Sequence, residues 1–175
     1  MRLIDGFHPA EYLRTERHAH INSVLVKREA AERTGEFDTS LRATEDLEWL
    51  ARLVHEAEFC AVPEVLLSYD RSAPEGALTH HAGREDVFRD HANREAMLLK
   101  IRERCGTRRG WDESAWRFRA GLEFRSFVRH RLRARQWRKA IELFEKGMEL
   151  SHGAEPLARL RGKVRKARFK ALFGG

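Results

Sequence analysis

Glu45 and Asp46 are adjacent carboxylates at the predicted start of an amphipathic helix, and they are where this sequence could do chemistry. A carboxylate held in such a position can accept a proton from a substrate hydroxyl. The pair also has a purely structural explanation, because the helix dipole favours acids in a first turn by about 0.3–1 kcal/mol. The flanking sequence must therefore decide between the catalytic and the structural explanation of this pair.

Two further segments flank this pair in a definite order. A turn with Gly35, Phe37 and Asp38 precedes the helix, and a Pro-Glu-x-Leu-Leu-x-Tyr segment over residues 63–69 follows it. Across roughly residues 15–72, the arrangement resembles the acceptor-side half of an inverting family 2 glycosyltransferase of the GT-A fold. The resemblance implies transfer of a sugar from a nucleotide-sugar donor to a hydroxyl of a glycan or lipid-linked acceptor.

The resemblance also implies roles for individual residues. Asp46 would be the catalytic base, and Glu45 a second acid beside the acceptor hydroxyl. The implied substrate-binding residues are Gly35, Asp38, Trp49 and Arg71. For Trp49, the residue type favours packing in the core over stacking on a sugar.

A divalent metal, Mg or Mn, belongs to the same implied chemistry. In the family an Asp-x-Asp motif supplies its carboxylate ligands, which suit a hard cation. This sequence contains no Asp-x-Asp. The metal ligands and the donor-binding half are therefore expected outside this chain, which is interpreted as a fragment that is inactive alone unless a partner complements it.

The pattern of apolar residues predicts an α+β fold. The first domain, residues 1–80, is expected to be the C-terminal part of a GT-A-like domain, and residues 81–175 a basic helical extension. β-Branched and apolar runs favour short strands, and i, i+3, i+4 spacings favour helices. Strands are predicted at 21–26, 59–62 and 65–69, and helices at about 27–33, 44–57, 83–104, 112–133, 136–151 and 155–172.

Charge divides the chain more sharply than its net value of +7 indicates. Residues 1–100 hold 13 Lys and Arg against 19 Asp and Glu, whereas residues 101–175 hold 21 against 8. A balance of −6 is thus followed by one of +13, which points to an anionic partner for the second half. The alternative function is therefore a non-catalytic basic helical module that binds an anionic membrane surface or nucleic acid.

The segment 157–172 is the candidate membrane surface. Seven Lys and Arg and no acid follow Leu157, a pattern that suits a helix lying in an anionic bilayer surface. The residues that fall on one helical face are Leu157, Leu160, Val164, Ala167, Ala171 and Leu172. Packing of that face on neighbouring helices is the equal alternative. Aromatic and Arg residues also interleave over 116–138, but an amphipathic packed helix explains them better, so nucleic acid is not the expected partner.

The remaining composition predicts a cytoplasmic protein, with peripheral attachment to the inner face of the membrane as a variant. No apolar window approaches the roughly 18 residues of a spanning helix, and the first residues lack the apolar run of a signal peptide. Cys60 and Cys105 have no metal-binding spacing and are expected to be reduced, buried thiols.

Overall fold

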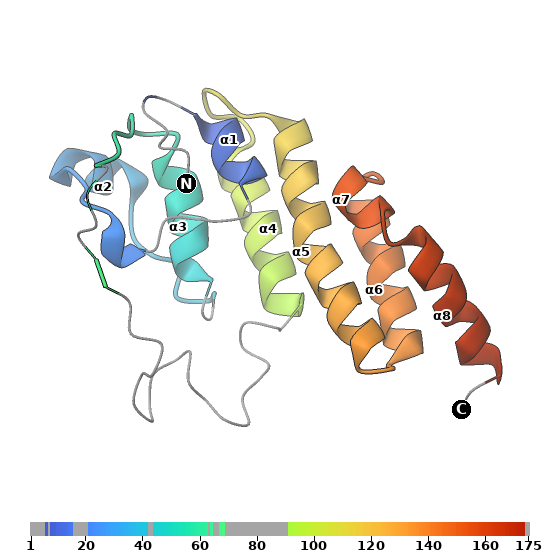
Figure 1. Ribbon diagram of the computed structural model, residues 1–175. Coiled ribbons are helices and arrows are strands. Elements are labelled where there is room, and N and C mark those ends of the chain that lie inside the picture. The colour runs from blue at the N-terminus through green and yellow to red at the C-terminus, as the bar shows by residue number, and fades with distance from the viewer. Residues whose placement is uncertain are drawn as a thin grey trace. The chain divides into compact units, whose positions relative to one another are not determined.

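The computed structural model describes residues 6, 8–15, 21–41, 44–62, 64, 67–68 and 91–173. The chain forms two compact units, Met1–Trp111 and Asp112–Gly175. Helices dominate both of them (Figure 1). The predicted domain boundary near residue 80 lies outside the described residues.

Helix α3 is the centre of the first unit. It contacts α1, α2 and α4, and its Trp49, Leu50 and Leu53 are buried together with Ala30 of α2. The Tyr12 hydroxyl of α1 donates a hydrogen bond to the carbonyl of Leu47, which fixes α1 on α3. The helical segments of this unit are α1 (Pro9–Arg14), the 3₁₀ turn η1 (Ile21–Ser23), α2 (Arg28–Thr34), α3 (Glu45–Leu53) and α4 (His91–Cys105).

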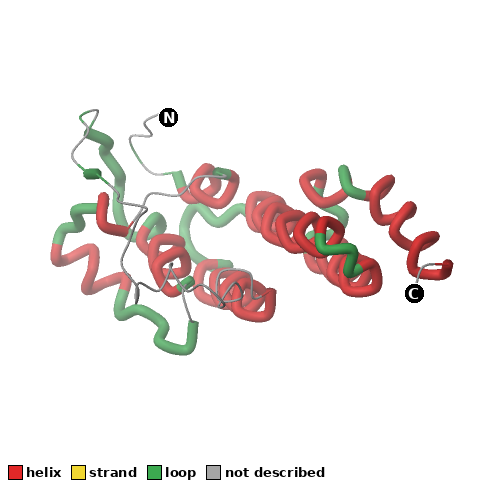
Figure 2. Tube along the Cα trace, turned by 60° about the horizontal axis from the view of Figure 1, so that its bottom comes forward, coloured by secondary structure: helices red, strands yellow, loops and turns green. Residues whose placement is uncertain are grey.

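The predicted α+β class is wrong for the part of the chain that the structure describes, which contains no strand (Figure 2). A single antiparallel bridge joins Gly6 and Phe59. The predicted strand at 21–26 begins as the turn η1, and its Val24 and Val26 pack on the core around α3. The predicted strand at 65–69 lies largely outside the described residues. A short β-branched run is buried equally well against a helix, which is why its pattern alone does not specify a strand.

The helices of this unit were predicted more accurately. Helix α2 ends at Gly35, whose φ of +78° is the left-handed conformation that favours glycine at a helix C-terminus. Helix α3 begins after Thr44 as predicted, but it ends at Leu53 rather than near residue 57. The Thr44 hydroxyl does not cap the helix; it accepts a hydrogen bond from the Asn93 amide of α4 at 2.9 Å.

The second unit is a bundle in which α6 lies between α5 and α8, as Figure 1 shows. The short α7 contacts both α5 and α6. Its helices are α5 (Glu113–Arg133), α6 (Trp137–Leu150), α7 (Glu155–Ala158) and α8 (Arg161–Phe173). The predicted helix at 155–172 is therefore two helices, separated at residues 159–160.

Local sequence explains how this unit begins and how closely it packs. The Asp112 carboxylate caps α5 by accepting the backbone N–H groups of Ser114 and Ala115, a contribution of about 1 kcal/mol. Gly147 of α6 lies so close to α5 that an added Cβ would stand 2.6 Å from the side chain of Phe124. The absence of a side chain at Gly147 is what allows α5 and α6 to approach.

Within the described residues, no helix is both long enough and apolar enough to cross a bilayer.

Candidate functional site

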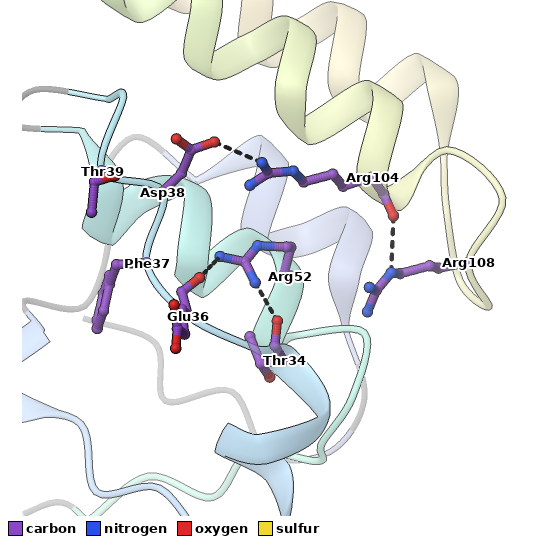
Figure 3. A pocket seen from close by; sticks show the side chains of 8 residues that line it. All are labelled: Thr34, Glu36, Phe37, Asp38, Thr39, Arg52, Arg104 and Arg108. Atoms are coloured by element: carbon purple, nitrogen blue, oxygen red, sulfur yellow. Dashed lines mark hydrogen bonds and ion pairs between the residues drawn. The ribbon is translucent and has the colours of Figure 1, made fainter.

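The first unit has an open polar cavity of about 480 Å³ beside the turn that follows α2 (Figure 3). The turn supplies one wall, and side chains of α3, α4 and the residues just after α4 supply the other. The lining residues are Thr34, Glu36, Phe37, Asp38, Thr39, Arg52, Arg104 and Arg108.

Asp38 is held at this cavity by two cations of α4. Its Oδ2 lies 2.5 Å from Nζ of Lys100 and 2.7 Å from Nη2 of Arg104. Its Oδ1 accepts hydrogen bonds from the backbone N–H and the hydroxyl of Ser40. The Lys100 ammonium, with Ser40 and Arg104, holds the pKa of Asp38 well below its usual range, so the carboxylate stays ionised.

A second acid, Glu48, is fully buried beneath Asp38. Its carboxylate accepts from Nε of Arg52 at 2.9 Å, from Nη2 of Arg52 at 3.0 Å, and from Nη1 of Arg104 at 3.0 Å. Arg52 also donates to the carbonyl oxygens of Thr34 and Glu36. We call Asp38, Glu48, Arg52, Lys100 and Arg104 the ionic clamp, because together they join the turn, α3 and α4.

The charged groups of the ionic clamp bind one another, as in a network that stabilises the fold. The Arg52 guanidinium is committed to one carboxylate and two carbonyls, and Arg104 bridges two carboxylates. Arg108 extends the network by pairing with Glu56. Because carboxylates offset the cations at each step, the cavity does not present the concentrated positive charge that a phosphate site requires.

The side chains at this cavity do not suit the divalent metal that the resemblance implied. A cation on Asp38 would stand against Lys100 and Arg104, both within 3 Å of its Oδ2. In the described ranges, no three His, Cys, Asp or Glu side chains come together as a ligand set. We therefore assign no metal to this cavity.

The structure does not bring the predicted catalytic pair into the cavity. Asp46 is half-buried, and its Oδ1 accepts the backbone N–H of Leu47 at 2.8 Å, which is a helix-terminal role. Oε2 of Glu45 is buried and meets no hydrogen-bond partner among the described residues. Neither side chain lines the cavity.

The predicted substrate-binding residues have mixed outcomes. Trp49 is a core residue: its indole N–H donates to the carbonyl of Gly35 at 2.7 Å, and its ring stacks on Phe37 with centroids 5.0 Å apart. Gly35, Asp38 and Trp49 are thus gathered around one turn, and the contacts they make hold that turn in place. Arg71 lies outside the described residues.

Sequence reasoning missed the cations that hold Asp38. Lys100, Arg104 and Arg108 recur every four residues, and in a helix this spacing places side chains on one face. The same spacing joins Glu48 to Arg52. This periodicity indicates a charged helix face, but it does not indicate which acid the cations bind. Asp38 is about sixty residues away in the sequence.

The two thiols differ in environment. Cys105 is buried as predicted, and burial raises its pKa to about 11, so it stays a protonated and unreactive thiol. Cys60 is exposed, which corrects the prediction that both are buried.

The second unit gathers positive charge at one end. Residues 124–141, which span the turn from α5 to α6, hold seven Lys and Arg and no acid. Residues 156–175 likewise hold seven Lys and Arg and no acid. Nζ of Lys170 in α8 lies 4.9 Å from the ring centre of Trp137 at the start of α6, so the C-terminal part of α8 reaches the α5–α6 turn (Figure 1).

We call this surface the basic end. Most of its cations are exposed, and Arg131 donates to the neutral amide oxygen of Gln136, a contact that leaves its charge uncancelled. Arg168 is paired with Glu145 at 2.6 Å. The exposed charged and large apolar members of the basic end are Arg129, Arg133, Arg135, Arg138, Lys139, Arg165, Lys166, Arg168, Phe169, Lys170 and Leu172.

The predicted membrane-facing side of 157–172 is only partly available. Leu157, Leu160, Val164 and Ala167 are buried in the bundle, where α8 packs on α6. Leu172, at the end of the predicted face, is 78% exposed, and Phe169, which lies off that face, is 67% exposed. Exposed large apolar side chains next to concentrated charge are the feature of the basic end that helix packing does not explain.

The chain matches no protein-family model, no curated protein and no solved structure. Together with the absence of strands from the described residues, this overturns the resemblance to a family 2 glycosyltransferase, whose GT-A fold is built on a sheet. The prediction of sugar transfer therefore no longer has a family resemblance behind it. The activity, its nucleotide-sugar donor and its glycan or lipid-linked acceptor stay untested predictions.

Proposed function

We propose that the protein binds anionic membrane surfaces peripherally, through the basic end of its second unit. The observation that carries this proposal is the convergence of two acid-free basic segments, 124–141 and 156–175, around the exposed Phe169 and Leu172. Segment 156–175 supplies the projecting apolar groups together with cations, and segment 124–141 widens the cationic surface beside them.

The energetics suit reversible attachment. Each Lys or Arg close to an anionic leaflet contributes about 1 kcal/mol, and this contribution falls with rising salt. The apolar side chains add a term that salt does not screen, because they leave water for the acyl boundary of the bilayer. A surface with five or more exposed cations therefore needs only shallow insertion to remain bound.

The apolar pair is also what favours lipid over nucleic acid. Phosphates of either partner would attract the cations, and Phe169 could stack on a base. Leu172 offers no π face for stacking, whereas acyl chains accept Phe169 and Leu172 equally. Their i, i+3 spacing places both side chains on one side of α8, so they can enter the same interface.

We expect the full chain to float with phosphatidylcholine vesicles that contain phosphatidylglycerol, and not with phosphatidylcholine vesicles alone. Binding should decline as salt rises, because the attraction is between charges near a surface. Replacement of Phe169 and Leu172 by Ser should weaken binding about tenfold, through loss of the unscreened apolar term. Vesicle flotation over a lipid titration measures both effects.

Leu25→Ser is the matched control for the serine variant. Leu25 is also fully exposed, but it lies in the first unit, so its replacement should leave vesicle binding unchanged. Equal binding to neutral and anionic vesicles would refute the proposal. So would binding to duplex RNA without binding to anionic vesicles.

A further inference from the structure

The turn at the basic end carries an arginine where helices commonly place glycine. Arg135 has a φ of +56° and follows the last residues of α5. The backbone N–H of Gln136 donates to the carbonyl of Arg131 at 2.9 Å, and that of Arg135 to Leu132 at 3.3 Å. These two bonds define a Schellman ending, whose left-handed position is costly for any residue with a Cβ.

Helix α6 ends in the same way at the other end of the unit. His152 has a φ of +50° and donates its backbone N–H to Glu149, and Gly153 donates to Met148 at 2.8 Å. Because α5 and α6 run antiparallel, His152 and Arg135 lie at opposite ends of the hairpin (Figure 1). The chain therefore provides two equivalent strained turns, and only one of them is on the basic end.

We infer that the Arg135 side chain binds a lipid phosphate at the basic end. This role would explain why the position holds arginine, although glycine would suit its backbone better. This inference rests on the proposed function. The Arg135 side chain is exposed, so it contributes little packing, and its guanidinium can bind a phosphate with two parallel hydrogen bonds. Histidine is among the residues enriched in the left-handed region, whereas arginine is not, so a left-handed arginine at an exposed site is a reason to assign its side chain a function.

The test is Arg135→Gly in the full chain, with stability and binding measured separately. Hydrogen exchange of the α5 amides should slow by about two- to fivefold or stay unchanged, because glycine relieves the left-handed strain. Partition onto phosphatidylglycerol vesicles should fall about fivefold, the effect of one cation at an anionic surface. Weaker vesicle binding without faster exchange is the expected signature.

His152→Gly is the matched control, since it relieves the same strain away from the basic end. It should slow exchange to a similar extent and leave vesicle binding as in the wild type. Wild-type binding by Arg135→Gly would overturn the assignment of Arg135, and so would faster exchange, which would give the side chain a structural role. A wild-type chain that fails to bind anionic vesicles would instead refute the proposed function itself.

Discussion

Glu48→Gln is expected to destabilise the first unit by about 3–5 kcal/mol, because it leaves a buried arginine without its countercharge. The Glu48 side chain is fully buried, and Arg52 is almost as inaccessible. Three guanidinium N–H groups converge on the carboxylate. A glutamine keeps one acceptor oxygen but places an NH₂ group against the guanidinium donors. The charge of Arg52 then stays buried without a counterion, and some guanidinium N–H groups have no acceptor.

Segment-resolved hydrogen exchange gives the free energy of opening for this unit without contribution from the other. The amides of Leu50 to Leu53 in α3 lie in the core and should report the full loss. Glu11→Gln is the control, because Glu11 makes an exposed pair with His8 and its replacement should cost less than about 1 kcal/mol. An equally small effect at Glu48 would show that the ionic clamp does not hold the unit together.

Removal of three charges from the basic end is expected to weaken vesicle binding about 100-fold at low salt. The variant replaces Arg135, Arg138 and Lys139 with Gln. Each cation near an anionic leaflet contributes about 1 kcal/mol, and about 1.4 kcal/mol corresponds to tenfold in affinity. A titration of phosphatidylglycerol vesicles against the full chain, repeated at several salt concentrations, should also show a shallower salt dependence for the variant.

The control removes the same number of charges just before and at the start of α8, as Arg159, Arg161 and Lys163 to Gln. A helix rises about 1.5 Å per residue, so Lys163 lies roughly 13 Å from Leu172, beyond the Debye length of about 8 Å at physiological salt. At physiological salt this variant should bind within about threefold of the wild type. Equal losses in the two variants would mean that net charge, and not the basic end, governs binding.

The helices were largely predictable from the sequence because their signals are local. Gly35 ended α2, Asp112 capped α5, and apolar spacing located α3, α5 and α6 within a few residues. The failed prediction of strands has the opposite cause. Residues 21–26 are apolar and β-branched, and only the tertiary structure reveals that their burial comes from α3 and not from a neighbouring strand.

The candidate sites depended still more on tertiary contacts. Asp38 was predicted to bind substrate, and only the tertiary structure shows that Lys100 and Arg104 hold its carboxylate. The apolar stripe of 157–172 was visible in the sequence, whereas its coverage by α6 and the emergence of Phe169 and Leu172 were not. The basic end itself exists only because α8 returns to the α5–α6 turn, where Lys170 meets Trp137.

A polarity-sensitive fluorophore is the most direct test of whether the C-terminal end of α8 enters an anionic bilayer. Cys60→Ser removes the exposed thiol, and Cys105 is buried and unreactive, so a single new cysteine can be labelled. The emission of a label at Leu172→Cys is expected to shift to the blue on phosphatidylglycerol vesicles and not on neutral ones. A label at Lys163→Cys should remain in water on both. No shift at position 172, or equal shifts at both positions, would show that this end of α8 does not enter the bilayer.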